Sequence, residues 1–160
     1  MLKHILVPLD FRFRSRAPLV TAAMLARENG ADVTLLCVED PGENLPAVDV
    51  AEFLSDAALV VLQHGAWARV QSIRGRPAHS AIGEYAAGVK ADIVVMGARG
   101  RTGFASAQWR RTTEAVVANS EVAVLVIHES ESRRERVVWR TGTTPTFELA
   151  LVPSDALIDA

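Results

Sequence analysis

Short runs of consecutive apolar residues constrain the fold of this chain more than any other feature. Residues 3–9 (KHILVPL), 33–38 (VTLLCV), 92–96 (DIVVM) and 122–127 (VAVLVI) are rich in β-branched side chains and are too short for typical helices. An apolar run without polar alternation indicates a strand covered on both faces, as in a parallel sheet with crossover helices on either side. These runs therefore predict an α/β protein.

Helical patterns separate the predicted strands. Apolar residues recur at helical spacing within residues 19–28, 47–64 and 78–89. Residues 67–74 alternate between apolar and polar side chains, as an edge strand does. After residue 96 we expect a long loop that ends where Thr112 or Thr113 caps a helix reaching Ala118.

Strands and helices thus alternate five times along residues 1–128. This alternation predicts a Rossmann-like, doubly wound, five-stranded parallel sheet with right-handed crossovers and the order 3-2-1-4-5. In such sheets ligands bind beyond the carboxyl ends of the strands where the strand order reverses, here between the first and fourth strands.

The last part of the chain has a different composition. Residues 129–160 are charged, then rich in Thr, Gly and Pro, and we expect a tail that is docked or mobile. Residues 149–155 (LALVPSD) echo residues 4–10 (HILVPLD), which leaves open a truncated second copy of the domain or a chance similarity. A strand with half a helix does not fold alone.

Composition excludes several classes of protein. The net charge of −2 provides no general basic field for nucleic acid, and no apolar stretch is long enough to span a membrane. The single cysteine, Cys37, excludes a disulfide framework, and we expect a cytoplasmic protein. His4, His64, His79 and His128 show no metal-ligand spacing, so no metal site is expected.

Arginines concentrate after the first and fourth predicted strands. The chain has fifteen arginines and two lysines, and seven of the arginines fall into two groups: Arg12, Arg14 and Arg16, then Arg99, Arg101, Arg110 and Arg111. Arginine suits bidentate contacts to oxyanions. Because the predicted fold brings both groups to one crevice, they favour an anion site over a merely solvated surface.

Two features beside this crevice allow more than one interpretation. The turn Gly97-Ala98-Arg99-Gly100 follows the fourth strand and can present backbone N–H groups to a phosphate, although it is neither a dinucleotide fingerprint nor a Walker sequence. Asp10 follows the first strand and either contacts a ligand or metal or forms an Asx-type cap at the N-terminus of the next helix.

The chain resembles the universal stress protein family over about its first 128 residues. The resemblance rests on HILVPLD, on Ser15 in the loop that follows, on VTLLCVEDP, on DIVVMGARGRTGF and on VAVLVI. It implies a Rossmann-like domain that commonly dimerises through its last strand. One branch of the family binds ATP through a G-x-x-G-x9-G-[S/T] motif, and another branch lacks the motif and binds no nucleotide.

Half of that motif is present. Gly97 and Gly100 match its first two glycines, and nine residues then lead to Arg110-Arg111 where the family has Gly and Ser or Thr. Arginine does not allow the close backbone approach of glycine but can place a guanidinium on a phosphate. Thr112 stands one residue beyond the position of the family's hydroxyl.

The resemblance also implies roles for residues of the other loops. Asp10 matches an acidic residue near the nucleoside, Val38 matches the position whose backbone contacts adenine, and Phe11-Arg12 replace a small pair. The implied nucleotide-binding set is Pro8, Leu9, Asp10, Val38, Met96, Gly97, Arg99, Gly100, Arg110, Arg111 and Thr112.

Two hypotheses follow. The first is a homodimeric stress-response regulator that binds ATP or AMP, with or without Mg²⁺, and has no catalytic residues, so that hydrolysis is slow at most. The alternative is a nucleotide-free dimerisation or protein-interaction module whose crevice is filled by Phe11, Arg110 and Arg111. Aromatic residues beside arginines, as at residues 11–14 and at Trp109, suggest a lid or a partner contact rather than single-strand nucleic-acid binding.

Overall fold

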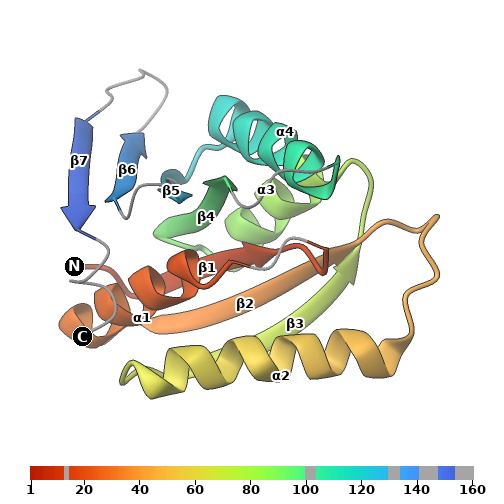
Figure 1. The fold of residues 1–160 in the computed structure, drawn as a ribbon, viewed down its shortest axis with the longest axis horizontal. Helices are drawn as coiled ribbons and strands as arrows, with labels where there is room; N and C mark the ends of the chain where they lie inside the picture. Colours follow the sequence, from red (N-terminus) through yellow and green to blue (C-terminus); the bar gives the residue numbers. More distant parts are fainter. Residues whose placement is uncertain (13–14, 100–103, 130–133, 141–147, 154–160) are drawn as a thin grey trace.

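The structure is a computed structural model that describes residues 1–12, 15–99, 104–129, 134–140 and 148–153. Its centre is a twisted sheet flanked by helices (Figure 1). The five predicted strands are present and parallel, in the predicted order 3-2-1-4-5. They are β1 (His4–Leu9), β2 (Asp32–Glu39), β3 (Ala68–Arg74), β4 (Ile93–Arg99) and β5 (Ala123–Glu129).

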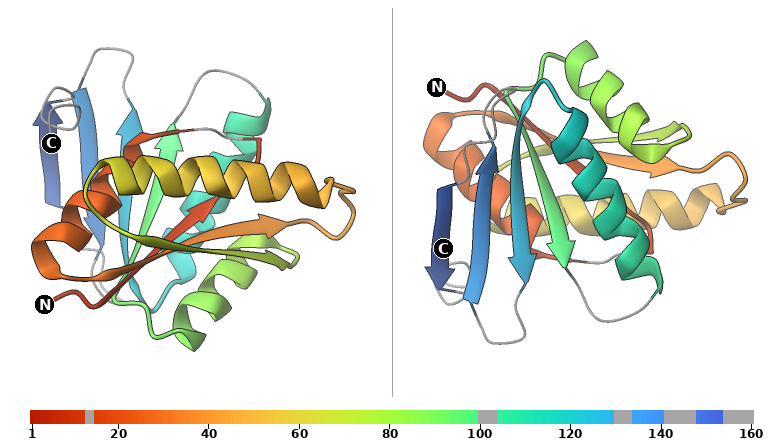
Figure 2. Two further views of the ribbon diagram at one scale, coloured as in Figure 1. Left: turned by 90° about the horizontal axis from the view of Figure 1, so that it is seen from below. Right: turned by 90° about the horizontal axis from the view of Figure 1, so that it is seen from above.

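Four helices connect the strands and cover both faces of the sheet. α1 (Ala17–Asn29) and α2 (Ala47–Gln63) lie on one face, and α3 (Ala78–Gly88) and α4 (Phe104–Asn119) lie on the other (Figures 1 and 2). Gly30 follows α1 with a φ of 65°, a left-handed conformation that glycine adopts without strain. The Asn29-Gly30 signal in the sequence therefore marks the real end of this helix.

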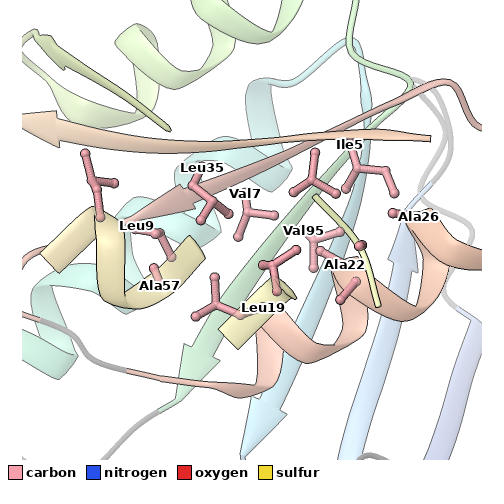
Figure 3. Close-up of a cluster of buried hydrophobic side chains, with 14 of the residues drawn as sticks. Ile5, Val7, Leu9, Leu19, Ala22, Ala26, Leu35, Ala57 and Val95 are labelled. Carbon is pink, nitrogen blue, oxygen red and sulfur yellow. The ribbon is translucent and has the colours of Figure 1, made fainter. Parts of the chain in front are cut away.

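The two sheet faces carry two separate cores, as the alternation of side chains along a strand requires. Ile5, Val7 and Leu9 point from β1 toward α1 and α2 (Figure 3), whereas Leu6 joins Met96 in the core beneath α3 and α4. Every one of these strand residues is less than a tenth exposed. Continuous burial on both faces is the reason for the continuous apolar runs in the sequence.

Helix α4 differs from the expectation. It begins at Phe104, so the segment expected to be a loop before Thr112 forms two additional helical turns. Trp109, Thr113 and Val116 are buried and spaced three or four residues apart, which places them on one face against the sheet. The prediction of a loop for this segment was wrong. The burial of Trp109 against the sheet favours a helix there, whereas the motif spacing had suggested a loop.

The tail adds two strands to the sheet. β6 (Arg134–Arg140) pairs antiparallel with β5, and β7 (Glu148–Pro153) pairs antiparallel with β6, which gives a sheet of seven strands. The segment that echoes the start of the chain contributes to β7. Neither strand is predicted from the sequence, because the tail has no clear hydrophobic period.

None of the helices in the described part of the chain is long and apolar enough to cross a bilayer.

Candidate functional site

A cleft of about 450 Å³ lies at the carboxyl ends of β1 and β2, on the face covered by α3 and α4. Its walls come from three regions: the segments after β1 and β2, the connection from β3 to α3, and α4. The lining residues are Asp10, Arg12, Val38, Asp40, Glu43, Gly75, Arg76, Pro77, Ala78, His79, Gln108, Arg111, Thr112 and Ala115. The cleft lies beside the predicted switch point between β1 and β4, since its lining includes residues after β1 and residues of α4, the helix that follows β4, but none of the described residues of β4 itself.

Asp10 directly follows the carboxyl end of β1. Its Oδ1 accepts a hydrogen bond of 2.8 Å from the backbone N–H of Arg12, which closes an Asx turn where a helix cap was one of the two expectations. The residue does not cap α1, whose N-cap position is Arg16. Burial raises the pKa of the Asp10 carboxyl, and the Arg12 backbone hydrogen bond and guanidinium partly offset this. Asp10 therefore closes a local turn and also lines the cleft.

Ion pairs neutralise two of the three arginines in the cleft. Arg12 Nη2 lies 2.7 Å from Glu43 Oε1, and Arg76 Nε lies 3.5 Å from Asp40 Oδ2. The Asp40 carboxylate also accepts the Gly42 N–H at 2.9 Å. Each pair joins different connecting segments, so the pairs also hold the rim of the cleft together.

Of the two neighbouring arginines of α4, only Arg111 lines the cleft. Gln108, Arg111, Thr112 and Ala115 line the cleft, at helical spacings of three, four and seven residues. Arg111 is exposed and has no ion-pair partner among the described residues. Arg110 does not line the cleft, and its Nε lies 3.8 Å from Glu114 Oε1 on the same helix.

The position of Arg110 and Arg111 inside a helix changes what their backbone can do. Only the first four N–H groups of a helix lack an intrahelical acceptor, and α4 begins at Phe104. The N–H groups of Arg110, Arg111 and Thr112 are therefore committed to the helix. The Thr112 hydroxyl donates to the Gln108 carbonyl at 3.3 Å. Side chains, and not backbone, offer this wall's contacts to a ligand.

The remaining residues of the expected set lie behind the cleft or outside the described residues. Pro8, Leu9, Met96 and Gly97 are buried in β1 and β4, and none of them lines the cleft. Arg99 ends β4, with its side chain outside what the structure describes.

Of four further predicted positions, three lie outside the described residues and one is buried in the core. Gly100, Phe13 and Arg14 lie outside the described residues. Trp109 is only 3% exposed and belongs to the core beneath α3 and α4, so its expected role as a lid or partner contact was wrong.

The alternative hypothesis of a filled crevice finds only one of its three residues at the cleft. Phe11 packs edge-on against Phe53 of α2, with ring centroids 5.5 Å apart, toward the opposite core. Arg110 faces Glu114, which leaves Arg111 alone at the cleft.

Sequence reasoning missed two parts of the site. The β3–α3 connection contributes Arg76, and the first turn of α3 contributes His79. No motif marks either residue, although the shared carboxyl edge of parallel strands brings this connection to the cleft. The buried Thr113 hydroxyl donates to the Gly97 carbonyl at 3.0 Å and joins α4 to β4, which continues through Gly97 to Arg99 instead of ending at Met96 as expected. Residues 97 and 113 are too far apart in sequence for a local pattern to show this bond.

No group of three or more His, Cys, Asp or Glu side chains in the described ranges could hold a metal ion. A second groove, of about 400 Å³, lies between α3 and the end of α4 and includes Ser80, Glu84 and Asn119. It lies away from the strand ends, so the chemistry of the switch point belongs to the first cleft.

Comparison with known proteins now identifies the family. The model of the universal stress protein family matches residues 1–128. The chain belongs to the universal stress protein family. Its five parallel strands in the order 3-2-1-4-5, with helices on both faces, are the architecture of solved universal stress proteins. No curated protein sequence matches the chain significantly.

Solved universal stress proteins share the fold at low sequence identity. One, in complex with cAMP, is 23% identical with a TM-score of 0.65 over 81% of this chain and 99% of its own. The Archaeoglobus fulgidus protein in complex with dAMP is 23% identical, with a TM-score of 0.63 over 79% and 98%. UspA from Lactobacillus plantarum is 23% identical, with a TM-score of 0.63 over 78% and 97%. These similarities establish the fold.

Proposed function

We propose that this universal stress protein is a cytoplasmic stress-response regulator that binds an adenine nucleotide in the cleft at the switch point. The observation that carries the proposal is an open cleft lined by Asp10, Val38 and Arg111, an arginine with no ion-pair partner among the residues that the structure describes. Its volume of about 450 Å³ falls within the usual range for small-molecule sites, roughly 300–1,000 Å³.

The arrangement of charge supports a nucleotide that lies across the cleft. Asp10 can accept hydrogen bonds from ribose hydroxyl groups, because a carboxylate has lone pairs left after one Asx-turn hydrogen bond. Arg111 can donate two parallel hydrogen bonds to a phosphate. Val38 stands at the end of β2, where it offers apolar surface and backbone groups to a base.

Structures of two family members with cAMP and dAMP support an adenine nucleotide as the ligand. The open cleft favours this function over the nucleotide-free module, because Phe11 and Arg110 lie elsewhere.

The same residues favour holding a nucleotide over hydrolysing it. A general base needs a free acceptor within reach of the attacking water. Asp40 and Glu43 are held in ion pairs with Arg76 and Arg12, and the remaining acceptor sites of Asp10 are those proposed above to bind the ribose. We therefore propose a regulatory rather than an enzymatic role.

Isothermal titration calorimetry of the full chain with AMP and with ATP tests the proposal. We expect binding to the wild-type protein and a loss of about tenfold or more in affinity for Arg111→Gln, since a charge-assisted contact is worth roughly 1.5–3 kcal/mol. Arg110→Gln is the matched control, because it removes the same charge from the next residue of α4 outside the cleft.

Two results would contradict the proposal. One is the absence of heat with either nucleotide at millimolar concentration. The other is an equal loss of affinity in both variants, which would indicate a general charge effect rather than a contact in the cleft.

A further inference from the structure

We propose that the cleft prefers an adenine nucleotide with a single phosphate group to one with three. The proposal rests on the proposed function and specifies its ligand. It follows from the charges of the residues that line the cleft and from the position of the lining residues within α4, beyond its first turn.

The described walls of the cleft carry no excess positive charge. Three arginines line it together with three carboxylates. Two of the arginines are already paired across the rim at 2.7 and 3.5 Å, which leaves Arg111 as the one guanidinium without an acidic partner among the described lining residues. One guanidinium matches one phosphate well, since the two pair as a planar, bidentate contact.

Additional phosphates would meet carboxylates. Asp10, Asp40 and Glu43 line the same space of about 450 Å³. Like charges that are brought together in a partly desolvated site repel one another. In the described part of the chain no group of three or more His, Cys, Asp or Glu side chains would hold Mg²⁺ before a nucleotide binds, so an ion that screens a triphosphate has to enter with it.

The part of α4 that lines the cleft does not provide the other usual way of binding a polyphosphate. Chains of phosphates are commonly cradled by free backbone N–H groups at a glycine-rich turn and a helix start. The cleft side of α4, from Gln108 to Ala115, lies beyond its first turn, so its N–H groups bond within the helix. This wall offers a phosphate the Arg111 side chain without a backbone cradle.

A titration series on the wild-type full chain tests the preference directly. We expect AMP to bind at least about tenfold more tightly than ATP, with ADP between them, both in EDTA and in excess Mg²⁺. Adenosine should bind more weakly than AMP, and Arg111→Gln should remove the difference between AMP and adenosine.

A variant that gains ATP affinity excludes a merely structural explanation. Asp40→Asn keeps an oxygen that can accept the Gly42 N–H but releases Arg76 from its ion pair. The cleft then has a second unpaired guanidinium, and we expect the ratio of ATP to AMP affinity to rise by about three- to tenfold. Asp56→Asn makes the same charge change at an exposed position of α2 that does not line the cleft, and it should leave the ratio of ATP to AMP affinity unchanged.

The outcomes separate the two proposals. If no adenine nucleotide binds, the proposed function fails. If ATP binds as tightly as AMP or more tightly, the preference is overturned while the proposed function stands. An unchanged ratio in Asp40→Asn, or an equal rise in Asp56→Asn, would show that paired charges in the cleft do not set the preference.

Discussion

Arg110 and Arg111 are adjacent in sequence, yet they face different surroundings. Successive residues of an α-helix are turned by about 100°, so one guanidinium points to the cleft while the other reaches Glu114. As a pair the two arginines suggested either a phosphate clamp or a block. The structure assigns them separate environments, and single substitutions are therefore more informative than changing both.

Asp92 gives a residue-scale prediction for acid stability. Its Oδ2 accepts the backbone N–H groups of Lys3 and His4 at 2.7 and 2.8 Å, and these hydrogen bonds lower the pKa of the carboxyl below its ordinary value of 3.8. A lowered pKa in the folded state means that the unfolded state binds more protons between the two pKa values. The contribution is therefore complete above about 3.8 and is lost as the pH falls through the folded-state pKa.

We predict that Asp92→Ala lowers the melting temperature at pH 7. The difference in melting temperature between the variant and the wild type should become smaller below pH 4. Thermal unfolding followed by circular dichroism from pH 3 to 7 measures this. A gap independent of pH would show that the ionised carboxylate is not the stabilising group.

Cys37 provides a second prediction at this scale. The side chain is fully buried in β2, and burial together with nearby carboxylates raises the pKa of its thiol to about 12. Since the thiolate is the reactive form, we expect no reaction with Ellman's reagent in native protein at pH 8 and one equivalent in urea. Rapid labelling of native protein would contradict the burial of Cys37.

At the scale of elements, α4 is tied to the last part of β4, which carries the first glycine of the motif. The helix extends back to Phe104 because Trp109 fills the core beneath it. This extension places Thr113 over β4, where its hydroxyl donates to Gly97 at 3.0 Å. One buried hydrogen bond therefore connects the helix wall of the cleft to the strand whose end carries the motif.

We predict that Thr113→Val lowers the free energy of unfolding by about 1–2 kcal/mol, because it leaves the buried Gly97 carbonyl without this donor. Thr112→Val is the control. Its hydroxyl only returns to the carbonyl of its own helix turn at 3.3 Å, and we expect a change within about 0.5 kcal/mol. Urea denaturation monitored by circular dichroism compares the two, and equal effects would count against a special role for Thr113.

At the scale of the whole molecule, the tail changes which strand edges are free. β5 has β4 on one side and β6 on the other, so both rows of its backbone groups are paired. The family resemblance implies a homodimer through the last strand of the domain. In this chain β6 occupies the edge of β5 that such a dimer would use, and the outer edge belongs to β7.

We therefore predict that weakening β6 promotes self-association. Val138 pairs with Val126 of β5 and with Leu149 of β7, and proline at this position removes an N–H group from the middle strand of the three. An exposed strand edge readily pairs with another chain.

Light scattering coupled to size-exclusion chromatography should show a higher average mass for Val138→Pro than for wild type. Val138→Thr, which keeps the N–H group, should match wild type. Identical masses for all three would show that β6 does not control association through β5.

Much of the molecule follows from local pattern. Continuous apolar runs identify the five parallel strands, helical spacing identifies α1, α2 and α3, and the alternation of the two gives the strand order and the edge at which the cleft lies. These features are predictable because each depends on residues close together in sequence or on general rules of connection. The Asx turn of Asp10 is local as well, although the sequence suggested a cap on the following helix instead, and α1 begins too far along the chain for Asp10 to cap it.

The sequence by itself thus determined the α/β class, the strand order, the family and the edge of the sheet where a ligand would bind. Only the tertiary structure decided where α4 begins, that Trp109 belongs to the core, that Arg111 rather than Arg110 lines the cleft, and that the tail covers β5. The physical reason is that these last features depend on contacts between segments distant in sequence, where the burial of one aromatic side chain or the pairing of one strand edge outweighs local preference.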